Sequence, residues 1–215
     1  MEASRGEAKE LPFIALAETL KAVEIPVQLL KDLLTAYRMD VTQKRYANFD
    51  EVLFYCKHSA NPVGRLVLHI FGYKQESLYL LSDNICSALQ LANFWQDVAV
   101  DFAKDRIYIP QDLMQKHGVT EEQLRAQDAG ENFQNLLREC SRKTAALFNA
   151  GLPLCAQVGR DLKLEMRLTW LGGTTILKKL AENRYDPFRR RPVLSFTDKL
   201  SLLGRALWPQ NLESL

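Results

Sequence analysis

The chain is poor in the residues that build zinc sites and disulfide frameworks. Its 215 residues include four cysteines and three histidines, with no Cys-x-x-Cys pair and no cluster of cysteine with histidine. The cysteines are scattered at Cys56, Cys86, Cys140 and Cys155, and the histidines lie far apart at His58, His69 and His117. We therefore expect reduced structural thiols, as in a cytoplasmic protein, and neither zinc nor disulfides.

Long apolar runs and a strong charge imbalance are also absent from the sequence. No uninterrupted apolar run approaches the roughly 18 residues that a membrane-spanning helix needs. The polar residues 1–10, which we expect to be disordered, lack the apolar core of a secretory signal. The net charge of +2 does not suggest a nucleic-acid partner. With 47% hydrophobic and 25% charged residues, the composition is that of an ordinary globular protein.

Apolar residues recur with helical periodicity over almost the whole sequence, without a β-hairpin signal, a repeat or a low-complexity linker. We expect helices at residues 11–23, 27–38, 49–58, 63–71, 75–103, 133–150, 154–180 and 195–207. The helix at 75–103 could be irregular near residues 82–84, residues 107–110 should be extended, and Gly72 should end the helix before it. The fold class that follows is all-α, with one helical-bundle domain over residues 1–215.

The strongest functional signal is a stripe of oxygen-bearing side chains. Asn93, Asp97 and Asp101 are four residues apart each time, so a helix places them on one face, and Gln90 joins the same stripe. The residues between them are mostly apolar, and two carboxylates at this spacing repel each other mildly. Mg²⁺ is typically held by one or two carboxylates together with substrate phosphates. The stripe therefore predicts a site for Mg²⁺ and a diphosphate, and a solvated polar face is the alternative.

Further polar residues follow the stripe or lie elsewhere on predicted helices. Lys104 and Arg106 come just after it and could hold phosphate oxygens, before Pro110 marks a break. Asp40 could cap the next segment, which we favour, or place an extra acid near the site. Tyr185 could be an amphipathic boundary residue or aim its hydroxyl at a diphosphate or a carbocation.

Three glycines and a basic run also allow more than one interpretation. Gly64 lies in an apolar helix and indicates a close approach, either of a ligand or of another helix. Gly172 and Gly173 predict a kink or a close-packing point in the helix at 154–180. The basic run at 189–191 could be a solvated face or could meet a diphosphate or an acidic lipid surface.

These motifs resemble those of the squalene/phytoene synthase family, the all-α terpenoid synthases that act on prenyl diphosphates. The Asn93-x-x-x-Asp97-x-x-x-Asp101 stripe, followed by Arg106-Ile107-Tyr108-Ile109-Pro110, resembles the family's second aspartate-rich motif and its sequel. Tyr55-Cys56, with Ala60 and Val63-Gly64 after it, resembles another family helix, and Tyr185 matches a family tyrosine at the far end of the cavity. The resemblance runs from about residue 11 to residue 208.

Within the family, residues 93–97, 40–46, 59–65 and 188–192 are most similar to bacterial hydroxysqualene synthases of hopanoid-type squalene biosynthesis. The resemblance implies conversion of presqualene diphosphate to hydroxysqualene and pyrophosphate, with Mg²⁺ as cofactor. It implies metal binding by Asn93, Asp97 and Asp101, catalytic roles for Asp97, Asp101, Tyr55 and Tyr185, and substrate binding by Gln90, Asn93, Arg106, Tyr46 and Gly64. Tyr46, Tyr55, Phe94 and Tyr185 are candidates for an aromatic lining that stabilises a carbocation.

The resemblance also implies partners, and the sequence departs from the family at one point. The apolar substrate suggests peripheral contact with the inner face of a membrane and with enzymes of the same pathway. The family's first motif, D-x-x-x-D, is not found in residues 1–39. We therefore expect an N-terminally shortened terpenoid-synthase bundle with weakened Mg²⁺–diphosphate binding, a cavity open on one side and exposed apolar surface. Two alternatives remain: a condensing synthase that makes presqualene diphosphate or a carotenoid precursor, and a non-catalytic scaffold that binds prenyl diphosphates.

Overall fold

The computed structural model describes residues 10–207, and this part of the chain is built from helices without a strand. The helices are α2 (Leu11–Ala22), α3 (Val27–Thr42), α4 (Phe49–Ser59), α5 (Asn61–Ile70), α6 (Glu76–Gln96), α7 (Val98–Phe102), α8 (Gln111–His117), α9 (Glu121–Arg125), α10 (Glu131–Gly151), α11 (Leu154–Gln157), α12 (Arg160–Glu182) and α13 (Phe196–Leu207). The predicted all-α class is confirmed. The prediction of disorder covers residues 1–10, and residues 1–9 lie outside the described residues. Glu10 is described and is the N-cap residue of α2.

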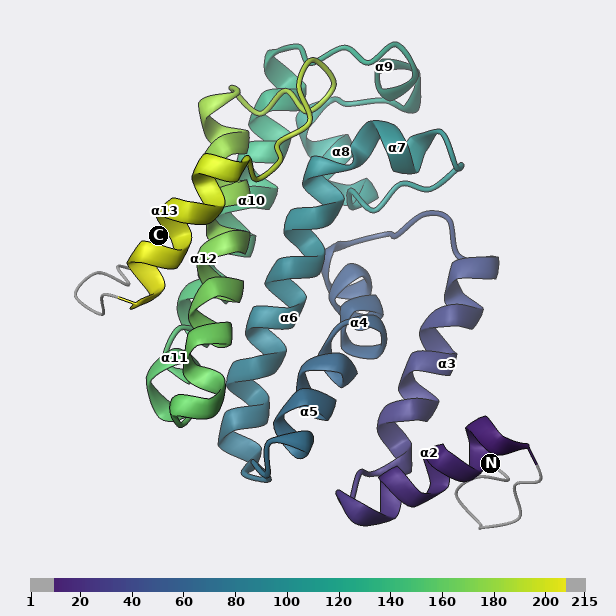
Figure 1. Cartoon of the computed structure of the whole chain (residues 1–215). Helices are drawn as coiled ribbons and strands as arrows, with labels where there is room; N and C mark the ends of the chain where they lie inside the picture. The colour runs from purple at the N-terminus through teal and green to yellow at the C-terminus, as the bar shows by residue number, and fades with distance from the viewer. Residues whose placement is uncertain (1–9, 208–215) are drawn as a thin grey trace.

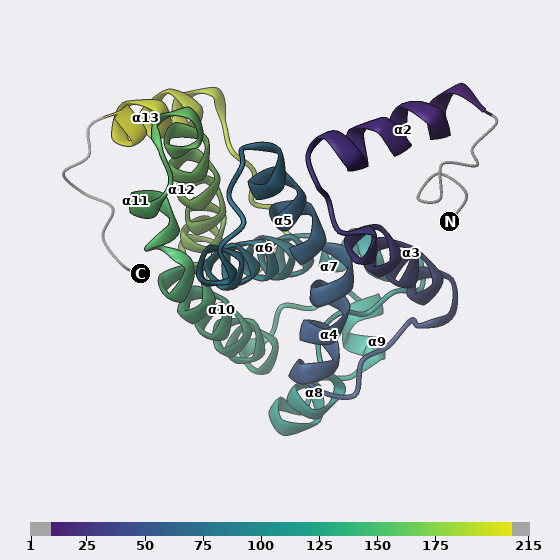
Figure 2. The ribbon, with the colours of Figure 1, turned by 90° about the horizontal axis from the view of Figure 1, so that it is seen from below.

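Helix α6 is the centre of the bundle. It contacts α4, α5, α10, α11 and α12, and Figures 1 and 2 show it between α12 and α13 on one side and α3 on the other. Ala88, Leu91 and Trp95 are buried on it at helical spacing, and the Trp95 indole donates a hydrogen bond of 2.8 Å to the Thr144 hydroxyl on α10. This central position fixes the stripe at the C-terminal end of α6.

Small residues allow the close approach of helices, and glycines end two of them. A Cβ atom added to Gly173 on α12 would lie 2.7 Å from the Leu89 side chain on α6, so Gly173 marks a close-packing point. Gly72 and Gly118, at φ of 80° and 65°, end α5 and α8 in the left-handed region that glycine adopts without strain. All four cysteines are free.

Two predicted helices are interrupted at positions that the sequence periodicity did not indicate. The helix expected at 75–103 is regular at 82–84 but changes at Asp97 (φ −105°, ψ 14°), between α6 and α7. The backbone bonds from Asp97 N to Asn93 O (3.0 Å) and from Asp101 N to Asp97 O (2.8 Å) preserve the helical spacing there. The helix expected at 154–180 breaks after α11, where Val158 is extended and the Gly159 N–H donates to the Tyr73 hydroxyl.

Most of the core forms one large buried cluster, and a small second cluster of Leu20, Ile25 and Leu29 lies under α2 and the start of α3. Several apolar side chains remain exposed on α3 and α13, including Tyr37, Val41, Phe196 and Leu200. None of the helices described between residues 10 and 207 combines the length and the apolar character needed to cross a bilayer.

Candidate active site

The predicted stripe lies on one face of α6 and α7 and is only partly open to solvent. Gln90 and Asp101 are half-buried, Asn93 is exposed, and the Asp97 side chain is 13% exposed. The neighbouring side chains Phe94, Trp95 and Val98 are all buried in the core. The two carboxylates are therefore more enclosed than those of an ordinary solvated helix face.

The two aspartates of the stripe influence each other electrostatically. Burial and, after it, the charge of Asp97 raise the pKa of Asp101 to about 6, against the lowering effect of Lys104 and Arg106. A raised carboxyl pKa means that the charged form of Asp101 is disfavoured in this enclosed position and would be stabilised by added positive charge. A divalent cation would supply that charge.

The donor set fits Mg²⁺ and does not form a complete cage. Residues 10–207 contain no group of three or more His, Cys, Asp or Glu side chains that could hold a metal ion. A cation here would rely on the oxygens of Asp97, Asp101 and Asn93, with the remaining positions supplied by ligand phosphate and water. Mg²⁺ is commonly held in this way, by few carboxylates plus substrate phosphates.

The pKa of Asp101 gives a prediction about stability in the metal-free protein. Because the folded state holds a proton on Asp101 that the unfolded state has lost, stability falls as the pH rises from about 4 to about 6. The Asp101→Asn variant lacks this effect. We expect its free energy of unfolding, relative to the unchanged chain, to rise by about 1–2 kcal/mol across that window, after allowance for solvent screening. Urea unfolding at several pH values measures this, and a difference independent of pH would contradict it.

Asp97 of the stripe forms an ion pair that the sequence did not predict. Arg191, in the segment between α12 and α13, donates from Nε to Asp97 Oδ1 and from Nη2 to Asp97 Oδ2, the latter at 3.2 Å. The hydrogen bond to this carboxylate raises the pKa of Arg191. One member of the basic run at 189–191 thus meets the predicted metal ligand instead of forming a solvated face.

Aromatic rings gather beside the stripe. Phe94 and Tyr108 stack with ring centroids 3.7 Å apart and planes 5° from parallel, and Tyr108 also contacts Tyr46 (5.5 Å) and Tyr55 (5.6 Å). Tyr46 meets Tyr55 edge-on at 5.9 Å. The predicted lining residues Tyr46, Tyr55 and Phe94 are therefore brought together, and Tyr108 joins them. We call Tyr46, Tyr55 and Tyr108 the tyrosine cluster.

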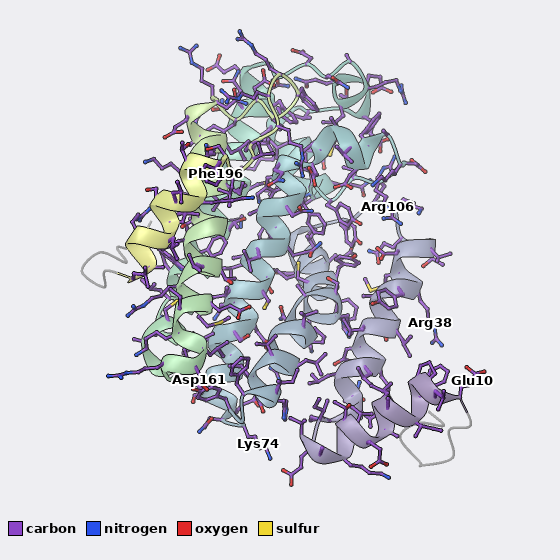
Figure 3. The ribbon with its side chains drawn as sticks, viewed as in Figure 1. Glu10, Arg38, Lys74, Arg106, Asp161 and Phe196 are labelled. Atoms are coloured by element: carbon purple, nitrogen blue, oxygen red, sulfur yellow. The ribbon has the colours of Figure 1, made fainter. Side chains whose placement is uncertain are left out.

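The basic residue after the stripe reaches the same region. Arg106, Asp101, Phe94 and Tyr108 all line one narrow cleft at the end of α7. The Arg106 guanidinium donates to the backbone carbonyl of Asp40 at 3.3 Å, and Figure 3 shows Arg106 beside the upper end of α3. Arg106 is thus placed where a diphosphate on the stripe would need a cation.

A second arginine holds the loop that carries Arg106. Arg45 donates to the Asp105 backbone carbonyl and carboxylate, both at 2.9 Å, and to both carboxylate oxygens of Glu121 at 2.7 and 2.9 Å. Asp105 has a φ of 56°, an uncommon conformation for a residue with a side chain. The bonds from Arg45 stabilise this turn and so fix the position of Arg106.

Asp40 does not act as the cap that we favoured. It lies inside α3, and its carboxylate Oδ1 accepts a hydrogen bond of 2.9 Å from the Tyr55 hydroxyl. Cap prediction failed because it used only neighbours in the sequence, whereas the partner of Asp40 is 15 residues away on α4.

Two predicted site residues lie apart from this group. Gly64 sits where α5 crosses α6, and an added Cβ would lie 2.5 Å from Cys86 Sγ, which favours the helix-crossing interpretation. Tyr185 follows α12 with a φ of 58°, and its ring lies under the Arg138 guanidinium of α10, 5.2 Å from the ring centroid. The structure brings neither residue to the tyrosine cluster.

Sequence reasoning missed Arg191, Tyr108 and Arg45 as parts of the site. Tyr108 could have been found, because it lies inside the segment that follows the stripe. For Arg191 the sequence offered only its place in a basic run. Arg45 could not be placed by local pattern, because its acidic partners, like that of Arg191, are distant in the sequence.

The arrangement of helices, with a carboxylate stripe beside an aromatic group, is that of the all-α isoprenoid synthases. The crystal structure of squalene synthase HpnC from Alicyclobacillus acidocaldarius matches with a TM-score of 0.84 and 35% identity, over 86% of this chain and 71% of that one. A dehydrosqualene synthase crystallised with a ligand has a TM-score of 0.86 over 96% of this chain and 74% of its own, but its 19% identity shows the fold alone.

The family model for squalene/phytoene synthase matches residues 2–198, and the chain belongs to this family. The hydroxysqualene synthase of Sinorhizobium fredii is 38% identical, over 80% of this chain and 58% of the relative. That of Rhodopseudomonas palustris is 35% identical, over 77% of this chain and 56% of the relative. The chain thus spans somewhat more than half the length of these curated relatives.

Proposed function

We propose that this chain acts on prenyl diphosphates and, more specifically, converts presqualene diphosphate to hydroxysqualene and pyrophosphate. The observation that carries the proposal is the enclosed Asp97–Asp101 pair beside the aromatic rings and Arg106. The identity with two hydroxysqualene synthases supports this particular step.

Each residue has a role that follows from its position. Asp97, Asp101 and Asn93 would hold Mg²⁺, which when bound neutralises the leaving diphosphate as a Lewis acid. Arg106 would add charge-assisted hydrogen bonds to phosphate oxygens. The faces of Phe94 and of the tyrosine cluster would stabilise the carbocation that remains, because aromatic rings attract cations.

A condensing synthase is the second candidate. It is favoured by the similarity to a phytoene synthase of Cucumis melo, 27% identical over 96% of this chain and 51% of the relative. Such an enzyme would make a carbon–carbon bond between two prenyl diphosphates, whereas the first proposal needs only one substrate molecule.

Two incubations with Mg²⁺ separate the candidates. We expect presqualene diphosphate to give hydroxysqualene and pyrophosphate, and farnesyl diphosphate alone to give no product. A product from farnesyl diphosphate would favour the condensing synthase. Binding of presqualene diphosphate without turnover, by a protein whose circular dichroism is helical, would favour a non-catalytic scaffold.

A further inference from the structure

A carboxylate and tyrosine hydroxyls meet where α3, α4 and the segment after α7 converge. Tyr55 is 5% exposed and donates its hydroxyl hydrogen to Asp40 Oδ1 at 2.9 Å. Among the described residues, the Asp40 carboxylate has no cationic partner within ion-pair distance, because Lys44 Nζ and Arg106 bond its backbone carbonyl instead. The carboxylate is thus held by one tyrosine and is not neutralised.

Beside this pair lies a hydroxyl that needs a partner. Tyr46 is 1% exposed, and its Oη makes no hydrogen bond within the described part of the chain. Burying a hydroxyl without a hydrogen bond costs on the order of 1–3 kcal/mol, so such a group points to a bound polar molecule. The ring of Tyr46 contacts those of Tyr55 and Tyr108, which places the unpartnered hydroxyl in the aromatic region of the site.

The reaction proposed above requires one chemical step that Asp97, Asp101 and Arg106 do not perform. After the diphosphate leaves, the carbocation must take up one water molecule and lose one proton to become an alcohol. The group that receives the proton must be protected from bulk solvent, or elimination and other side reactions compete.

We propose that Tyr46, Tyr55 and Asp40 form the water-capture site, in which Tyr46 holds the water and the Tyr55–Asp40 pair takes its proton. This inference rests on the proposed function and deepens it. The water oxygen forms the new C–O bond with its lone pair. One of its protons passes to Tyr55 Oη as the Tyr55 proton passes to Asp40, which leaves a neutral alcohol and a protonated Asp40. Asp40 returns the proton to solvent after the product departs.

The surroundings suit this task. Burial raises the pKa of Tyr55 and of Tyr46, and neighbouring Tyr108 and Asp40 act in the same direction, so both hydroxyls keep their hydrogens before the reaction. The bonds from Lys44 and Arg106 to the Asp40 carbonyl fix the end of α3 and with it the direction of the carboxylate. Proton transfer by positioned side chains typically contributes about 10²–10⁴-fold to a rate.

The test is the division between two products, because a merely structural role would not change it. Asp40→Asn and Tyr55→Phe would be given presqualene diphosphate and Mg²⁺ in water enriched in ¹⁸O, with pyrophosphate and organic products measured together. Whatever the change in total pyrophosphate release, we expect the ¹⁸O-labelled alcohol to fall at least about tenfold as a share of the pyrophosphate released, with elimination products replacing it. Tyr46→Phe should lower the alcohol share as well.

Tyr73→Phe is the matched control, because Tyr73 also donates its hydroxyl to an aspartate, Asp161 Oδ1 at 3.1 Å, but at the start of α12. Its alcohol share should equal that of the unchanged chain. If Asp40→Asn and Tyr55→Phe release pyrophosphate and still make the same share of alcohol, the water-capture site is wrong while the proposed function stands. If the unchanged chain releases no pyrophosphate, both are wrong for this chain.

Discussion

Replacing Asp97 with asparagine should lower the turnover of presqualene diphosphate by roughly 100-fold or more. The variant keeps the size of the side chain but removes the negative charge that faces Asp101 on the stripe. Metal-ion stabilisation of a leaving group is worth several kcal/mol, and each 1.4 kcal/mol changes a rate about tenfold. Pyrophosphate release at saturating Mg²⁺ measures the effect.

Two further variants make this result specific. Asp105→Asn changes an aspartate four residues further along the chain, whose side chain is 75% exposed. The asparagine oxygen can still accept from Arg45, and the Arg45 bond to the residue 105 carbonyl remains, so activity should stay within about twofold. Arg191→Gln removes the ion pair but leaves the Asp97 carboxylate, so it separates loss of the ligand from loss of the pair. Equal activity of Asp97→Asn and the unchanged chain would refute metal binding by the stripe.

Replacing Trp95 with alanine should destabilise the fold by about 3–5 kcal/mol. The Trp95 side chain is fully buried on α6, and its indole N–H donates to the Thr144 hydroxyl on α10, so the change leaves a cavity and removes a hydrogen bond at the centre of the bundle. Urea unfolding followed by circular dichroism measures the loss.

The control for Trp95 is an aromatic residue that makes little contact with the core. Phe54 on α4 is 52% exposed, and Phe54→Ala should cost no more than about 0.5 kcal/mol. If both variants lost the same small amount of stability, the α6–α10 contact would not be the centre of the core.

Local patterns in the sequence predicted the helices and the stripe because both depend on residues three or four positions apart. Asn93, Asp97 and Asp101 kept their spacing even though the helix axis is interrupted at Asp97. The break at Val158 coincides with a tertiary contact, the hydrogen bond from the Gly159 N–H to the Tyr73 hydroxyl, 86 residues away. Periodicity carries no information on such contacts.

The composition of the site was harder to predict, because its contacts join distant segments. Asp40 had two interpretations, and only its bond to Tyr55 decided between them. The choice at Gly64 depended on Cys86, which lies on another helix. The family resemblance implied a catalytic role for Tyr185, whereas in the structure its ring contacts the Arg138 guanidinium on α10.

The central position of α6 has a consequence for the order in which the site forms during synthesis. The chain emerges from its N-terminus at about 5–20 residues per second. Trp95 finds its partner Thr144 only 49 residues later, and Asp97 finds Arg191 only 94 residues later. The two carboxylates are therefore made early and spend several seconds without the helices that enclose them. The last contact of the site closes only when the segment between α12 and α13 has left the ribosome.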